Sequence, residues 1–220
     1  MKKIAIIGTR GYKRNHNYYD AVEALGEETV EVGIGTQLDC IKDVNGVIIP
    51  GGVDVNPALY HAQNTDSVDI FDELDALDME VIKIAVDNGI PILGTCRGHQ
   101  ILNVFFGGSL IQNVENCCIH RAVGLVDRVH EGRVEKNSFL YEIYGTDRIA
   151  TNSAHHQAIK TLGKELRAVE FSDDGLIEAM CHESLPIYGV QWHPERMCFA
   201  NKREDTIDGA GVFKYFLERC

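Results

Sequence analysis

A cysteine at position 96 stands in a setting that is typical of a catalytic nucleophile. Residues 94–98 read Gly-Thr-Cys-Arg-Gly and join an apolar run to a segment with helical spacing. This G-x-nucleophile-x-G pattern is that of a sharp strand-to-helix turn, which exposes the nucleophile above the sheet. The start of the following helix would favour the thiolate of Cys96 over the thiol. The alternative is a small side chain in the core, a common role of a free cysteine.

A general base for Cys96 is predicted in residues 189–195, which read Gly-Val-Gln-Trp-His-Pro-Glu. Pro194 disfavours a helical conformation at His193, and in an extended chain residues two apart project to the same side. Glu195 can then hold one ring nitrogen of His193 while the other faces a thiol.

Two alternatives compete with this interpretation of His193. It can be an ordinary histidine at a strand end, or part of the H-x-E motif of a zinc deaminase. The deaminase motif needs a later Pro-Cys-x-x-Cys. Because Arg-Met-Cys-Phe follows at 196–199, the deaminase is discarded.

Two glycines follow another apolar run, in residues 48–54 (Ile-Ile-Pro-Gly-Gly-Val-Asp). Because glycine has no Cβ, its backbone N–H can approach a ligand closely. The N–H groups of Gly52 and Arg97 are therefore the predicted donors to an oxyanion. Taken alone, Pro-Gly-Gly predicts only a turn. The functional interpretation depends on the nucleophile expected at the end of a neighbouring strand.

The remaining histidines and cysteines do not form a recognisable metal motif. His155 and His156 are adjacent, and residues 117–120 read Cys-Cys-Ile-His, but no H-E-x-x-H or ordered Cys/His set accompanies them. A polar loop that lines the cleft is the preferred interpretation, so we expect no metal and no cofactor. The chain has seven cysteines, an odd number without a C-x-x-C motif, which argues against a disulfide framework.

The composition excludes several classes of protein. The chain has 220 residues and a net charge of −12, with scattered lysines and arginines, so we expect no binding to nucleic acid or to an anionic membrane. The longest stretch without a charged residue, 98–114, contains polar side chains unsuited to a transmembrane helix. The first residues lack the long apolar region of a signal peptide, which favours a cytoplasmic location.

The elements that must position these residues alternate in the first half of the chain. Strands are predicted at 3–8, 29–34, 46–49 and 90–94, and helices at 18–25, 74–86 and 98–106. The second half predicts shorter strands at 123–134, 166–171, 176–181 and 187–191, and a final helix at 206–217.

The predicted fold class is α/β, with residues 1–220 as a single domain. An open, mostly parallel sheet is flanked by helices, and the C-terminal half adds an antiparallel portion. Sites in such sheets form beyond the carboxyl ends of the strands. Gly52 and Cys96 are both expected at such ends.

In three blocks the sequence resembles the class I glutamine amidotransferase superfamily. They read Pro-Gly-Gly at 50–52, Gly-Thr-Cys-Arg-Gly-His-Gln at 94–100 and Gly-Val-Gln-Trp-His-Pro-Glu at 189–195. The resemblance is strongest to the γ-glutamyl-γ-aminobutyrate hydrolase branch. The features that support this branch are residues 19–23, residues 51–57 with Tyr60, residues 152–157, and Arg97, where synthetase-linked amidotransferases more often carry an aromatic residue.

The resemblance implies a role for each matching residue. Cys96 would be the nucleophile, His193 the general base and acid, and Glu195 the orienting residue. The oxyanion donors would be Gly52 and Arg97. The matching candidates for holding substrate are Gln100, Ser153, His155, His156 and Gln157. The implied reaction is hydrolysis of a small γ-glutamyl amide through a thioester, and assembly into a homo-oligomer is left open.

Two departures from the family's pattern concern the amine side of the substrate. A run that often reads Arg-Asp-x-x-Glu is Leu-Asp-Ala-Leu-Asp at 74–78, and the chain is shorter than many members. Two other functions stay open beside the hydrolase. One is a glutaminase subunit that passes ammonia to a separate synthetase, and the other is a catalytically silent ligand-binding module.

Overall fold

A nine-stranded sheet runs through the protein, whose computed structural model describes residues 1–8, 12–124 and 126–220. Its order is β2-β1-β3-β4-β11-β10-β9-β6-β7. The strands are β1 (Lys3–Ile7), β2 (Glu28–Val32), β3 (Gly46–Ile49), β4 (Ile92–Thr95), β6 (Arg128–Val134), β7 (Arg148–Ser153), β9 (Leu166–Ser172), β10 (Ile177–His182) and β11 (Ile187–Val190). The strands from β2 to β11 pair in parallel, and the rest pair antiparallel. The predicted mixed sheet is confirmed.

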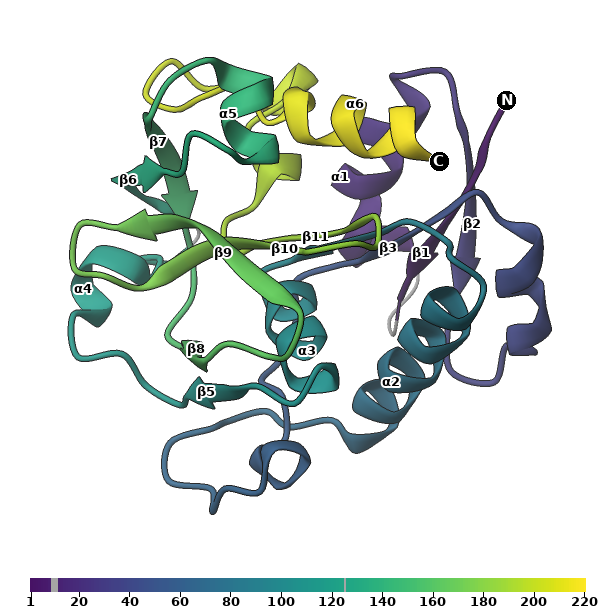
Figure 1. Cartoon of the computed structure of the whole chain (residues 1–220), viewed down its shortest axis with the longest axis horizontal. Coiled ribbons are helices and arrows are strands. Elements are labelled where there is room, and N and C mark those ends of the chain that lie inside the picture. Colours follow the sequence, from purple (N-terminus) through teal and green to yellow (C-terminus); the bar gives the residue numbers. More distant parts are fainter. Residues whose placement is uncertain (9–11, 125) are drawn as a thin grey trace.

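Helices cover both faces of this sheet (Figure 1). Those on one face are α1 (Tyr12–Glu23), α5 (Phe139–Tyr144) and α6 (Ala210–Arg219), and those on the other are α2 (Asp72–Asp87) and α3 (Arg97–Phe105). In β1, Ile4 and Ile6 pack into the core under the first set, and Ala5 and Ile7 pack into the core under the second. Because successive side chains point to opposite faces, a strand that is apolar throughout must be covered twice.

The predicted helices are present with shifted ends. α2 and α3 agree with the predicted ranges to within two residues, whereas α1 begins six residues before the predicted start, in a polar run without apolar spacing. The final helix, predicted from 206, begins at Ala210, because the Ile207 N–H bonds to the carbonyl oxygen of Ala150 on β7 (Arg148–Ser153) and not within a helix. No helix in the described part of the chain is long and apolar enough to span a membrane.

Short elements in the second half differ most from the prediction. Within the predicted strand 123–134 the β6 strand begins only at Arg128, and residue 125 lies outside the described residues. The elements that the pattern missed are β5 (Ser109–Ile111), α4 (Cys117–His120), α5, β7 and β8 (Ala158–Thr161), of which β5 and β8 form a separate two-stranded sheet. These segments are short, and strand stability comes from pairing with distant segments that a local pattern does not show.

The sheet brings three loops to one edge. β4 lies between β3 and β11, with Gly94 beside Ile49 on one side and beside Gly189 on the other. Because all three strands are parallel, their carboxyl ends meet at the same edge. The Pro-Gly-Gly loop, the turn at Cys96 and the loop that carries His193 therefore emerge next to one another.

Candidate active site

Cys96 occupies the turn between β4 and α3 in a backbone conformation that is rare for a non-glycine residue. Its φ and ψ are 50° and −105°, and such strain persists only where the surroundings enforce it. A Cβ on Gly98 would lie 1.9 Å from the Ile49 carbonyl oxygen, and one on Gly94 would lie 2.5 Å from the Gly98 carbonyl oxygen. The Cys96 N–H donates to the Val190 carbonyl oxygen over 2.8 Å. The two glycines and β11 thus hold the cysteine in its turn.

His193 and Glu195 form a buried pair in the loop after β11. The His193 Nδ1 atom lies 2.7 Å from Glu195 Oε1, and the two side chains are 4% and 2% exposed. Asn152 on β7 fixes this loop, because its Oδ1 accepts the His193 N–H (2.9 Å) and its Nδ2 donates to the His193 carbonyl oxygen (3.1 Å). With Nδ1 held by Glu195, the Nε2 atom is left for proton transfer.

The ring of His193 and the side chain of Cys96 meet across Gly51. A Cβ on Gly51 would lie 2.7 Å from His193 Cε1 and 3.4 Å from Cys96 Cβ, so a larger residue would displace the ring. A cavity of about 150 Å³ opens here. It is lined by Asn17, Tyr18, Gly51, Gly52, Cys96, Ala154, His193, Glu195 and Arg196. The structure therefore brings the expected nucleophile, base, orienting carboxylate and Gly52 into one cavity.

Opposing effects set the charges of the pair. Burial alone would lower the pKa of His193, but the Glu195 carboxylate and the Cys96 sulfur, which also hydrogen-bonds the ring, raise it to about 10. Burial would raise the pKa of Glu195, yet the charge and hydrogen bond of His193 bring it below its ordinary value. A protonated His193 beside the ionised Glu195 carboxylate is the arrangement that these interactions favour.

Tyr18 belongs to the site, although the sequence indicated only a position in a helix. Its hydroxyl lies 2.7 Å from Thr95 Oγ1 and accepts the Gly51 N–H over 3.1 Å. Burial, followed by the charge of Glu195, raises the pKa of Tyr18. The hydroxyl thus joins Thr95, the residue before Cys96, to the loop after β3. No local signal could have shown this, because the partners are 77 and 33 residues away.

The Arg97 side chain enters a buried cluster of charges on the α2 side of the sheet. Its guanidinium donates to Asp75 and Asp78, and all three side chains are at most 3% exposed. Burial would lower the pKa of Arg97, but the two carboxylates raise it. The Asn56 N–H also donates to Asp75 Oδ2 over 2.9 Å. Residues 74–78, which depart from the family's Arg-Asp-x-x-Glu pattern, therefore supply two carboxylates that hold Arg97 and the loop after Gly52.

Two of the expected substrate-binding residues lie behind the cavity wall. Gln100 donates to the Gln157 carbonyl oxygen (3.1 Å) and to Gln191 Oε1 (3.2 Å). Gln157 in turn donates from Nε2 to Ser67 Oγ over 2.8 Å. Both side chains are buried and stand outside the set that lines the cavity. They connect α3 to the loop after β7 instead of reaching the cavity themselves.

The other three candidates lie around Ala154, which lines the cavity. Ser153 and His155 are buried, and the Nδ1 atom of His155 lies 2.9 Å from the Gln157 carbonyl oxygen. His156 lies nearer the surface, with Nε2 3.0 Å from a carboxylate oxygen of Asp54. The loop thus presents the small side chain of Ala154 to the cavity, and its polar side chains are used to hold the loop.

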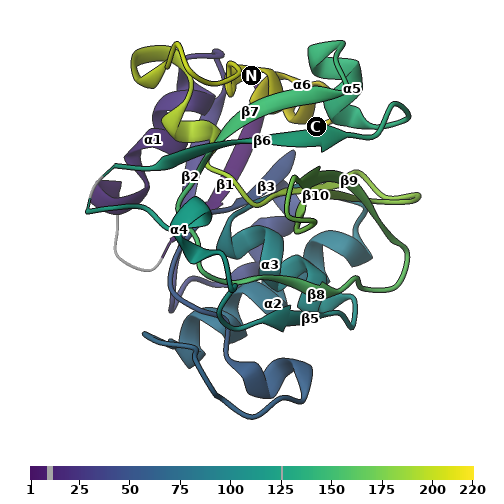
Figure 2. The ribbon, with the colours of Figure 1, turned by 90° about the vertical axis from the view of Figure 1, so that its left-hand side faces the viewer.

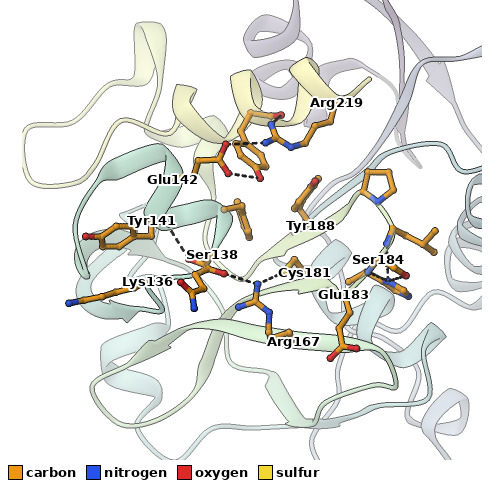
Figure 3. Close-up of a pocket in the computed structure, with 16 residues that line it drawn as sticks. Lys136, Ser138, Tyr141, Glu142, Arg167, Cys181, Glu183, Ser184, Tyr188 and Arg219 are labelled. Atoms are coloured by element: carbon orange, nitrogen blue, oxygen red, sulfur yellow. Dashed lines mark hydrogen bonds and ion pairs between the residues drawn. The ribbon is translucent and has the colours of Figure 1, made fainter.

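A larger depression of about 660 Å³ lies at the opposite edge of the sheet (Figure 3). It includes Pro186, which precedes the amino end of β11, whereas Cys96 follows the carboxyl end of β4. On its lining, Arg219 and Tyr215 donate to Glu142 over 3.2 and 3.1 Å. The chemistry predicted from the sequence therefore belongs to the smaller cavity.

Comparison with known proteins identifies relatives of this chain. Residues 5–195 match the family model Peptidase C26. A Schizosaccharomyces pombe protein named "putative glutamine amidotransferase" is 36% identical over 95% of this chain and 83% of its own length. The glutamine-hydrolysing GMP synthase subunit of Archaeoglobus fulgidus is 32% identical over 99% of this chain and 98% of its own length.

Solved structures share the fold at lower identity. The glutaminase domain of Trypanosoma brucei CTPS, solved with bound acivicin, superimposes with a TM-score of 0.70 at 16% identity, covering 100% of this chain and 93% of that one. A glutamine amidotransferase from Thermotoga maritima gives a TM-score of 0.65 at 17% identity, with 88% and 76% covered. These likenesses support the same α/β architecture.

Proposed function

Since the chain belongs to the Peptidase C26 family, which is class I glutamine amidotransferase-like, we propose that it hydrolyses γ-glutamyl amide bonds. The products are glutamate and an amine, and γ-glutamyl-γ-aminobutyrate is the proposed type of substrate. The observation that carries the proposal is the strained turn that holds Cys96 in one cavity with the His193–Glu195 pair. Residues 1–220 act in this proposal as one hydrolase domain.

The first half-reaction forms a thioester. The Cys96 thiolate attacks the γ-carbonyl carbon, and the oxyanion accepts hydrogen bonds from the N–H groups of Gly52 and Arg97. The Gly51 N–H is already used by Tyr18, which supports Gly52 as the donor from its loop. His193 then donates its proton to the leaving amine, and the C–N bond breaks.

The second half-reaction releases glutamate. A water molecule gives a proton to His193 Nε2 and attacks the thioester carbon, and the C–S bond breaks to restore the thiolate of Cys96. Glu195 keeps the ring oriented through Nδ1 in both steps. Gln100, Ser153, His155, His156 and Gln157 contribute to substrate binding by fixing the loop that presents Ala154.

The test is glutamate release by the purified protein from a panel of γ-glutamyl amides, including γ-glutamyl-γ-aminobutyrate and glutamine. Cys96→Ala is expected to lower kcat at least about a thousandfold, because the covalent intermediate cannot form. Cys181→Ala is the matched control, since Cys181 is also a buried free thiol but lines the other depression. Wild-type turnover by Cys96→Ala would overturn the proposal.

A second candidate is a glutaminase subunit that delivers ammonia to a separate synthetase. It is favoured by the GMP synthase relative from Archaeoglobus fulgidus, which this chain covers almost fully. The same assay separates the two functions. Release from glutamine only after a synthetase is added would support this candidate over a stand-alone hydrolase.

A further inference from the structure

Three histidines and a glutamate meet inside the antiparallel half of the protein, beside the catalytic cavity. His120 ends α4, His130 lies on β6, His155 follows β7 and Glu178 lies on β10. α4 packs against β6, as Figure 2 shows. One ligand-type atom from each of the four residues lies within 4.8 Å of all the others. The side chains are 1%, 8%, 2% and 0% exposed, in chain order.

The outer nitrogen of each ring already has an oxygen partner. The Nε2 atom of His120 lies 3.1 Å from a carboxylate oxygen of Asp174. His130 and His155 direct Nδ1 to the backbone carbonyl oxygens of Glu131 (3.3 Å) and Gln157 (2.9 Å). A carbonyl oxygen or carboxylate can only accept, so the protons sit on these outer nitrogens. The inner nitrogens therefore carry lone pairs.

These inner atoms face one oxygen and are left without partners. His120 Nδ1, His130 Nε2 and His155 Nε2 lie 3.6, 3.8 and 3.7 Å from Glu178 Oε1. The Nε2 atoms of His130 and His155 and both carboxylate oxygens of Glu178 have no hydrogen-bond partner among the described residues. The His120 Nδ1 atom has a marginal contact of 3.5 Å with Ser153 Oγ, whose proton is donated to the His120 carbonyl oxygen at 3.0 Å.

A proton on Glu178 leaves most of this cluster unpaired. A neutral Glu178 carries one proton, which can serve only one of the three ring lone pairs, and the others would stay buried and unpaired. Buried polar atoms without partners are rare and each needs an explanation, for which an ion is one of the physical candidates. A single cation at the centre would bind all four groups at once.

We propose that His120, His130, His155 and Glu178 form a binding site for a divalent transition-metal ion, with Zn²⁺ as the preferred ion. Imidazole nitrogens and a carboxylate suit zinc, whereas Mg²⁺ and Ca²⁺ prefer oxygen ligands alone. Bonds of about 2.0–2.1 Å in a tetrahedron place ligand atoms about 3.3 Å apart. The nitrogen-to-Glu178 separations of 3.6–3.8 Å need a small contraction, and the remaining separations, which lie within 4.8 Å, need side-chain adjustment on binding. The outer partners are those of metal-bound histidines, which donate their other N–H to a carboxylate or carbonyl.

The site is structural, since four protein ligands close a tetrahedral zinc site. The ion would join α4, β6, β10 and the loop after β7, which are distant in sequence. Ala154, which lines the catalytic cavity, directly precedes the ligand His155. The ion therefore stabilises one wall of the cavity without contacting the substrate.

The experiment measures bound metal, so its outcome does not depend on the proposed activity. The protein is stripped with a chelator, titrated with ZnCl₂ and dialysed, and the metal is counted per chain by mass spectrometry. One Zn²⁺ per chain is expected for the wild type, and less than a tenth of that for Glu178→Gln and for His130→Gln. His182→Gln is the matched control, because His182 is a buried histidine outside the cluster that accepts two backbone N–H groups.

Two further measurements, a thermal midpoint and a Co²⁺ absorption spectrum, test the proposal even if a variant fails to fold. Zn²⁺ is expected to raise the thermal midpoint of stripped wild-type protein, which needs no variant. Co²⁺ is expected to give the visible bands of a four-coordinate ion without thiolate charge-transfer absorption, which separates this site from one built on Cys117 or Cys118. Wild-type protein that retains no metal and shows no thermal shift overturns the proposal. So does full occupancy in folded Glu178→Gln.

Discussion

Two buried polar clusters flank the cavity at Cys96, and they differ in whether a permanent positive charge belongs to the cluster. On the parallel side, the Arg97 guanidinium pairs with the carboxylates of Asp75 and Asp78. Gly52 on the cavity wall packs against the same arginine, since a Cβ added to Gly52 would lie 3.0 Å from Arg97 Cδ. On the antiparallel side, Glu178 faces one nitrogen of each of three imidazoles. The first cluster contains an arginine, whereas the second consists of three histidines and a glutamate.

Each wall of the cavity is held by a different kind of interaction. Breaking a buried ion pair costs folding free energy, because removing one partner leaves the other charge buried without water or a counter-ion. The Arg97 cluster therefore holds the Gly52 loop with groups of the chain itself. In the proposed metal site, the histidine cluster holds the Ala154 loop through a bound ion. The stability of that wall then depends on whether the metal is bound.

The largest expected effect is on folding, from Arg97→Met. The substitution keeps the bulk of the side chain but leaves Asp75 and Asp78 buried without their cation. We expect the free energy of unfolding to fall by about 3–5 kcal/mol, measured by urea denaturation. Arg128→Met, at an exposed position on β6, is the control and should change it by less than about 0.5 kcal/mol.

A triple variant sharpens this result. Adding Asp75→Asn and Asp78→Asn to Arg97→Met removes every charge of the cluster, and we expect it to regain part of the lost stability, because no unpaired charge stays buried. A triple variant that is less stable than Arg97→Met would show that the charges are not what the single change exposes.

The next effect concerns the partner of a proposed metal ligand. Asp174 accepts from His120 and lies outside the ligand set. Asp174→Asn is expected to weaken Zn²⁺ binding by about 10–100-fold, because the carboxylate orients the ring and raises its basicity. Competition with a chromophoric chelator measures it. Unchanged affinity would mean that the outer hydrogen bond of His120 is not used in this way.

A third buried polar group, the His193–Glu195 pair, lies in the cavity itself, and its pH dependence can be tested. The raised pKa of His193 contributes stability that is fully present below pH 6.5 and is lost as the pH rises through about 10. Glu195→Gln removes the largest raising effect, so this loss and the alkaline fall of kcat/KM should both move to lower pH. Rate profiles and thermal midpoints across this range measure the shift. Superimposable alkaline limbs would contradict the orienting role of Glu195.

The smallest effect is expected at His156, the chain neighbour of a proposed ligand. His156 pairs with Asp54, and the two side chains are 17% and 13% exposed. His156→Asn should cost less than about 1 kcal/mol of stability, as partly exposed pairs do, and should leave bound Zn²⁺ at one per chain. Loss of the metal in this variant would show that the cluster is not limited to its four buried groups.

The residues next to one another in the chain were the ones that local patterns could predict. The turn at Cys96 needs Gly94 and Gly98 because of close backbone approach, and both stand within two positions of it. His193 and Glu195 are likewise two residues apart, and Pro194 restricts the backbone between them. The parallel strands were also predictable, because a strand covered on both faces is apolar throughout.

Local sequence patterns were therefore enough to predict the turn at Cys96, the His193–Glu195 pair and the alternation of strands and helices. The folded structure was needed to show that Tyr18 joins the site, that Asp75 and Asp78 hold Arg97, and that His120, His130, His155 and Glu178 converge. These contacts join distant segments through sheet order and helix packing, which no spacing in the chain encodes.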